Sequence, residues 1–357
     1  MTDAPSAPPA PRSSATAPPV TGTAAPGAST AGTATIGTAA EVLSAHLAAQ
    51  AGSFLRGLPA VDLRTLRRVG ATLHTFDALL DAAWSRELRE ELGRLGGILS
   101  QEPAYGRRLT RLLTSLDSLT SIDVPAPGPS GGPVPKPREA EGLLARHPGA
   151  PKARALLERQ LTLARSRAHT TALQELGSAR FHALADRMTL LVSDLPLRNP
   201  GERGSAAVLL PYAVAEARAL TSAVEALPLE RAAAPYNGDA LHDPGDDRPW
   251  IQVRGLTLRA QYALEVCAPQ LGGRAARPAA ALTELSRILA RHRDAAEAAE
   301  AAALAALTPR ITPATAYVLG VVHADQRLEV EAARHTFSST WPDLYRTGWL
   351  TDSWLTR

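Results

Sequence analysis

The chain contains little lysine and a single cysteine, and both shortages narrow what it can do. Of its 38 basic residues only Lys136 and Lys152 are lysines, and each directly follows a proline. A phosphate-binding loop needs a Gly-Lys-Ser/Thr sequence, so that class of nucleotide-binding enzyme is excluded. Cys267 stands alone, which excludes an intramolecular disulfide and a cysteine-rich metal site. A lone thiol is typical of a reducing compartment, and we expect a cytoplasmic protein.

The sequence also has few aromatic residues, no long apolar run and no recognisable secretory signal. The first 14 residues are rich in proline, alanine and serine and lack the apolar core of a signal peptide. No uninterrupted apolar run approaches the roughly 20 residues that cross a bilayer, so we expect no membrane partner. Aromatics make up 4% of the chain and the formal net charge is +3. These values argue against nucleic acid as a partner, because the chain offers neither a strong positive field nor an aromatic platform on which bases could stack.

Composition divides the chain into segments. Residues 1–38 consist almost entirely of Pro, Ala, Thr, Gly and Ser with two charges, which predicts a disordered tail. A second Pro/Gly-rich stretch at about 123–140 predicts a linker in which no helix persists. The sequence therefore predicts one helical domain over 39–350, with a first half at about 39–122 and the remainder at 141–350. Residues 351–357 are expected to form a C-terminal tail.

Apolar residues recur at helical spacing outside these segments. Leu66, Leu73, Phe76 and Leu80 share one stripe and predict the buried face of a helix over 63–80. Further helices are predicted over 84–99, 109–119, 152–176, 178–192 (with Ser178 as its N-cap), 208–227, 250–267, 282–307 and 312–337. Sustained alternation of β-branched and polar residues is almost absent. The sequence predicts an all-α protein of about ten helices.

Two parts of the chain are weakly similar to each other. Residues 63–68 (LRTLRR) and 253–259 (VRGLTLR) each read as a basic helix that opens a unit, and a stretch rich in leucine or arginine follows each. Internal similarity of this kind predicts two related helical halves.

These residues resemble the CHAD family, the conserved histidine α-helical domain, whose halves begin with a helix of the form His-x-x-Arg-x-x-x-Arg-Arg. The second half fits best, through Arg254, Arg259 and Tyr262 in the opening helix. Later stretches at 269–272 (PQLG), 289–294 (LARHRD) and 315–320 (TAYVLG), and a mid-chain boundary at 176–181 (LGSARF), are also similar. The resemblance covers about residues 38–350. It implies two pseudo-symmetric antiparallel helical-bundle halves.

The sequence departs from the family pattern at its name-giving positions. The family histidine would fall at Ile251 in the second half and, in an ungapped alignment, at Ala60 in the first. A family lysine is replaced by Leu258, and the first-half Leu-Gly-x-x-x-Asp turn reads LSQEPA at 99–104. The chain is therefore identified as a degenerate member of the family.

The resemblance implies binding of inorganic polyphosphate or a similar polyanion on a basic surface between the two halves. Guanidinium groups suit this role because they are always charged and present paired planar donors to phosphate oxygens. Such binding should weaken with salt, as it does for nucleic-acid backbones. The residues that the resemblance and the charge pattern assign to this site are Arg64, Arg67, Arg68, His74, Arg254, Arg259 and Arg293.

Each of these residues also has a purely structural interpretation. The arginines at 64, 67 and 68 are typical of a solvated basic helix face. Arg254 and Arg259 lie roughly 140° apart on a helix, so they cannot share one narrow stripe. His292 lines up with leucine and isoleucine positions and is predicted to be packed in the core. The arginines at 107, 108 and 111 are expected to be exposed to solvent.

The sequence shows no arrangement of catalytic residues. It has no Gly-x-Ser-x-Gly elbow, no glycine-rich dinucleotide turn and no pair of histidines at metal-ligand spacing on an apolar face. We therefore expect a non-catalytic module without a cofactor or metal, which binds a phosphorylated polyanion. The alternative is a CHAD-like scaffold that has lost phosphate binding and serves protein–protein interaction.

Overall fold

The computed structural model describes residues 37–57, 61–123, 140–199, 204–234, 238, 241, 245 and 247–346. These residues are mostly α-helical. The one sheet among them is an antiparallel pair of two-residue strands, β1 (Ile122–Asp123) and β2 (Ala140–Glu141). The all-α prediction is confirmed. The predicted N-terminal tail up to residue 36, the linker residues 124–139 and the C-terminal tail lie outside the described residues.

The first three helices begin where capping residues satisfy their free backbone N–H groups. Helix α1 (Ala39–Arg56) starts with a capping box between Thr38 and Glu41. Helix α2 (Leu63–Thr75) starts after Asp62, whose carboxylate accepts from a backbone N–H of the first turn. Helix α3 (Ala82–Thr120) starts after Asp81 in the same way. Because a cap contributes about 1 kcal/mol, these side chains help to fix where each helix begins.

Helix α2 ends earlier than the sequence predicts, but it buries the predicted face. The helix stops at Thr75, and the 3₁₀ turn η1 (Asp77–Leu79) follows it. Leu66, Leu73, Phe76 and Leu80 are all buried, as predicted. The apolar spacing therefore identified the buried residues correctly and placed the helix end five residues too late.

Helix α3 is one unbroken helix where the sequence predicts two. The gap between the helices predicted over 84–99 and 109–119 lies in the middle of α3 and includes Pro103. A proline inside a helix costs about 3 kcal/mol, since it removes a backbone hydrogen bond and crowds the preceding turn. Leu88 and Leu95 before it, and Leu112 and Leu116 after it, are buried. Each contributes about 1.5–3 kcal/mol, so packing on both sides outweighs the proline.

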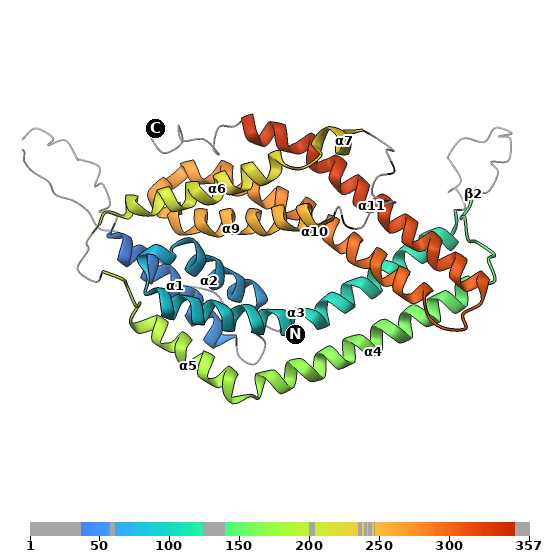
Figure 1. Cartoon of the computed structure of the whole chain (residues 1–357), viewed down its shortest axis with the longest axis horizontal. Helices are drawn as coiled ribbons and strands as arrows, with labels where there is room; N and C mark the ends of the chain where they lie inside the picture. The colour runs from blue at the N-terminus through green and yellow to red at the C-terminus, as the bar shows by residue number, and fades with distance from the viewer. Residues whose placement is uncertain are drawn as a thin grey trace, which may run out of the picture. The chain divides into compact units, whose positions relative to one another are not determined.

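The remaining elements follow in chain order (Figure 1). They are α4 (Ala150–Leu176), α5 (Ala179–Ser193), η2 (Ala206–Leu209), α6 (Leu210–Glu225), α7 (Leu229–Ala233), α9 (Asp247–Leu271), η4 (Gly272–Ala275), α10 (Ala276–Ala306) and α11 (Pro313–Arg346). Ser178 caps α5 by accepting from the N–H of Phe181, as predicted. Gly149, before α4, approaches the backbone at Ala314 so closely that a side chain would clash.

Three pairs of helices pack side by side along much of their length. Helix α3 packs against α4, α10 against α11, and α6 against α9 (Figure 1). The two helices that the sequence identified as openers of related halves, α2 and α9, contact each other directly. This contact brings residues almost 200 positions apart to the same place.

Buried apolar side chains form two main clusters. The larger one includes Leu66 and Leu73 of α2 together with Leu264 of α9. The second one includes Leu112 of α3 and Val318 of α11. With the two related halves that the sequence predicts, Leu264 and Tyr262 are expected in the core of the second half. Both are buried, but Leu264 shares the cluster of α2, because α2 and α9 pack together.

A buried polar network joins α9, α10 and α11. The Asp247 carboxylate accepts from Arg327 at 2.7 Å and from Arg334 at 2.6 Å. Arg334 also donates to Nε2 of His292 at 3.3 Å, and the His292 ring stacks on Trp250. His292 is 1% exposed, which confirms the prediction of a packed histidine. Its burial, with the nearby Arg334, lowers its pKa to about 3.

One helical stretch among the described residues, Ala206–Glu225, is long and apolar enough to cross a membrane by length and composition. Leu220 and Val224 of this stretch are fully buried in the larger cluster. Glu216 in its middle is engaged by polar side chains of two other helices. These contacts are those of a core helix.

Candidate functional site

Several sequence-predicted site residues meet at one pocket of 540 Å³. Helix α2 contributes Arg67 and His74, and α9 contributes Arg259. Helix α3 adds Arg89, which the sequence did not single out. The rest of the lining consists mostly of glycine and apolar residues. We call this cavity the basic pocket.

Glu216 of α6 holds two sides of the basic pocket together. Its carboxylate accepts from Nε of Arg259 at 3.1 Å and from the hydroxyl of Thr75 at 3.0 Å. It lies 4.0 Å from Nε2 of His74 and is only 10% exposed. Burial, and next the charge of Arg259, lowers the pKa of His74 below its ordinary 6.5. His74 is thus mainly neutral at pH 7, and an anion in the pocket would favour its protonated form.

Arg68 is committed to an intramolecular partner. Its Nε donates to Glu265 at 3.0 Å, and its guanidinium lies 5.8 Å from the centre of the Tyr262 ring. Both contacts link α2 to α9. The structure therefore gives Arg68 a role in positioning the two helices, with less of its charge available to a ligand.

Arg254 lies in a concentration of positive charge. Burial, followed by the charges of Arg293 and Arg67, lowers the pKa of Arg254 to about 10. Its Nε is buried without a hydrogen-bond partner among the described residues. Arg293 donates to Asp294 at 3.0 Å and lies 3.7 Å from Glu297, so its own charge is compensated. Arg67 is exposed and forms no ion pair with any described carboxylate.

The remaining predicted positions contribute less. Arg64 is exposed in the first turn of α2 and does not line the basic pocket. Ile251, at the family's histidine position, is 48% exposed and also lies outside the lining. Leu258, at the family's lysine position, does line the pocket. Ala60 is outside the described residues. The pocket has therefore lost one family cation from its wall.

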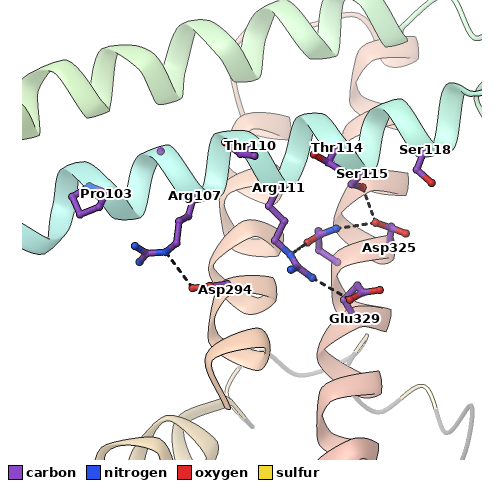
Figure 2. Close-up of a pocket in the computed structure, with 12 residues that line it drawn as sticks. Pro103, Arg107, Thr110, Arg111, Thr114, Ser115, Ser118, Asp294, Asp325 and Glu329 are labelled. Carbon is purple, nitrogen blue, oxygen red and sulfur yellow. Dashed lines mark hydrogen bonds and ion pairs between the residues drawn. The ribbon is translucent and has the colours of Figure 1, made fainter. Parts of the chain in front are cut away.

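A second pocket, of 720 Å³, lies between α3, α10 and α11 and has mixed charge (Figure 2). Arg107 is exposed, as expected, whereas Arg108 and Arg111 are only partly exposed, which corrects the expectation for those two; all three pair with carboxylates. Arg107 lies 3.5 Å from Asp294, Arg108 lies 3.2 Å from Glu297, and Arg111 donates to Glu329 at 3.2 Å. These ion pairs join α3 to the two other helices. Three carboxylates in the lining make this pocket less suited to a polyanion than the basic pocket.

Sequence reasoning missed Arg89, Glu216 and Glu265. Arg89 lies in a helix rich in both charge signs, and nothing in its spacing separates it from its neighbours. Glu216 and Glu265 acquire their roles from contacts with α2 that are 141 and 197 residues distant in sequence. No local pattern could have indicated these contacts.

Comparison with known proteins identifies the family of the chain. The family model of the CHAD domain matches residues 61–303, and the chain belongs to the CHAD family. Among solved structures it is similar to PptA from Streptomyces chartreusis, with 44% sequence identity, coverage of 86% of this chain and 99% of that chain, and a TM-score of 0.69. No curated protein matches the chain. The family resemblance inferred from the sequence is confirmed.

Proposed function

We propose that the protein is a non-catalytic module that binds inorganic polyphosphate, or a similar phosphorylated polyanion, at the basic pocket. The observation that carries this proposal is that Arg67, which lines the pocket, and Arg254, which lies outside its lining, repel each other, and neither forms an ion pair with a described carboxylate. Folding places like charges together only at a cost in free energy. A polyanion that reached both groups would relieve that cost and form charge-assisted hydrogen bonds.

The other cations of the pocket support the same ligand class. Arg259 and Arg89 line the cavity together with Arg67, so arginines from three helices reach one space. Arg259 and Arg89 already contact Glu216 and Asp77. A guanidinium has five N–H donors, so an arginine that holds a carboxylate can still donate to phosphate. If ligand binding protonates His74, its imidazole ring gains a second N–H donor for the ligand.

Two observations support a role without catalysis. Cys267 is fully buried, and burial raises the pKa of its thiol to about 12, so it is not a thiolate nucleophile at neutral pH. Among the described residues, no group of three potential metal ligands comes together. We place the protein in the cytoplasm, consistent with its one buried thiol.

The second candidate function is that of a scaffold for protein contacts. It is favoured by the extent of internal charge pairing, since Arg68, Arg94, Arg107 and Arg108 each contact a carboxylate of another helix. A surface with this much internal neutralisation attracts polyanions less strongly. Binding of polyphosphate by the unmodified protein separates the two functions.

The test is titration with long-chain polyphosphate at about 50 and 200 mM salt. The double variant Arg67→Ala/Arg254→Ala should bind about tenfold or more weakly, because each well-formed contact is worth roughly 1.5–3 kcal/mol. Its affinity should also depend less on salt. Arg159→Ala/Arg167→Ala, on the exposed surface of α4, is the control with equal charge loss. Equal effects of the two double variants would show only diffuse attraction and contradict the proposal.

A further inference from the structure

The wall of the basic pocket contains glycines that packing does not explain. Gly93, Gly96 and Gly97 of α3 and Gly70 of α2 all line the cavity. Each lies inside a helix, where glycine is less stable than alanine because it loses more backbone freedom on folding. None of them has a positive φ angle, so the backbone conformation does not require glycine.

The space beside these glycines is open. A Cβ atom added to any of the four would meet no heavy atom within 4 Å. Gly142 and Gly149 differ from them, since a Cβ there would collide with neighbouring backbone. Steric crowding thus explains why positions 142 and 149 are glycine. Among the described residues, no such crowding explains the glycines at the four pocket positions.

The three glycines of α3 form a bare strip on one face of the helix. At 100° per residue, positions 93, 96, 97 and 100 fall within a sector of roughly 100°, and the fourth of them is Ser100. The strip is about 10 Å long at 1.5 Å per residue. Arg89, one turn earlier on α3, stands at its end, and Arg67, His74 and Arg259 line the same cavity from α2 and α9. Cationic side chains thus share the cavity with a wall that carries no side chains.

We propose that these glycines are specificity-determining residues, which leave room for a linear polyphosphate segment to lie against the face of α3 while arginines bind its oxygens. This inference rests on the proposed function of the basic pocket. The inference adds that the basic pocket selects a ligand by the width of its chain as well as by its charge. A slender unbranched chain fits along a bare helix face, and bulk added to that face would exclude it.

The experiment compares Gly97→Ala and Gly97→Leu in the full chain, with polyphosphate affinity and thermal unfolding as the two readouts. Affinity should fall a few-fold for alanine and about tenfold or more for leucine. The Tm of the alanine variant should stay the same or rise by about 1–3 °C, because alanine and leucine favour helix over glycine. Gly320→Ala and Gly320→Leu are matched controls. Gly320 is an exposed glycine inside α11 that also has open space and does not line the pocket.

The outcomes distinguish the possible explanations. Unchanged affinity of Gly97→Leu would overturn the role of the glycines and leave polyphosphate binding intact. Equal losses for alanine and leucine would show that helix flexibility matters rather than room, and would also overturn it. Failure of the unmodified protein to bind polyphosphate would instead contradict the proposed function itself. Loss of affinity in the Gly320 variants would indicate a general effect of helix stability and overturn the inference.

Discussion

Arg254 of α9 is close enough to Arg67 of α2 for their charges to repel, and Arg67 forms no ion pair with a described carboxylate. The repulsion acts across the contact between the two helices. The positive charge of Arg293 also repels Arg254. The weaker attraction of Arg254 to Asp294 and Glu297 offsets this repulsion only in part. This arrangement stores unfavourable electrostatic energy around Arg67, which lines the proposed binding pocket.

Replacing Arg254 should therefore affect stability and binding in opposite directions. Arg254→Met keeps the apolar stem of the side chain and removes its charge. We expect the free energy of unfolding at pH 7 to rise by about 1–2 kcal/mol, because a partly buried and repelled charge is lost. Polyphosphate affinity should fall about tenfold. Urea denaturation and titration measure the two effects, and a stability loss above about 1 kcal/mol would contradict the view of Arg254 as an uncompensated charge.

Removing the intramolecular partner of Arg68 should strengthen binding. Glu265→Gln frees the guanidinium of Arg68 and adds one positive charge beside the pocket. We expect polyphosphate affinity to rise about three- to tenfold at low salt, and the gain to shrink as salt screens it. Glu284→Gln makes the same charge change in an exposed pair with Arg287 and is the control. Equal gains from both variants would assign the effect to net charge alone.

The carboxylate of Asp247 should be essential for stability. Asp247→Asn removes the carboxylate charge that the buried guanidinium groups of Arg327 and Arg334 contact. Breaking a buried ion pair from one side typically costs about 3–5 kcal/mol, and we expect a loss of that size in urea denaturation. Asp186→Asn, at an exposed position of α5, should change stability by less than about 0.5 kcal/mol. A similarly small effect at Asp247 would show that other contacts compensate the arginines.

Stability should fall with acid because His292 is buried in its neutral form. The pKa of His292 is about 3 in the folded chain, against an ordinary value of 6.5. Between these values the unfolded chain binds a proton that the folded chain does not, so folding stability decreases as the pH falls. The slope from this one group approaches about 1.4 kcal/mol per pH unit. It should vanish above pH 7.

The variant His292→Gln tests this assignment. Glutamine keeps an acceptor for Arg334 and cannot take up a proton in this range. Urea denaturation at pH 7 and pH 5 gives the free energy of unfolding at each pH. This free energy should fall less steeply with acid in the variant than in the unmodified protein. The difference between the two slopes should correspond to at most one bound proton. An unchanged slope would mean that other groups dominate the acid sensitivity.

Sequence periodicity identified what the helices bury better than where they end. The apolar stripe over 63–80 predicted four buried residues correctly, because that pattern is a local property of the chain. The sequence divided α3 into two helices, over 84–99 and 109–119, but the structure has one helix through Pro103, since packing on both sides of the proline outweighs its local cost. A single residue's propensity is a weaker determinant than the burial of a whole helix face.

The candidate site could be predicted only in part. The family resemblance gave Arg67, His74 and Arg259, which meet at one pocket. It could not separate Arg67 from its neighbour Arg68, because the difference between them is the contact of Arg68 with Glu265, 197 residues away. The pairing of Arg107 and Arg108 with α10 is non-local in the same way. Which arginines are compensated is thus a property of the tertiary structure.

The continuity of α3 through Pro103 has a consequence for how the molecule comes apart. Leu92 of this helix lies in the larger apolar cluster and Leu112 in the second, and α10 likewise joins the two through Leu285 and Ala302. Two rigid elements therefore span both clusters, and neither cluster can melt without exposing part of a helix that the other one holds. A calorimeter should record one cooperative transition for the helical domain. A polyanion bound near α2 would then protect the distant end of α3 from unfolding as effectively as it protects the residues around the binding site.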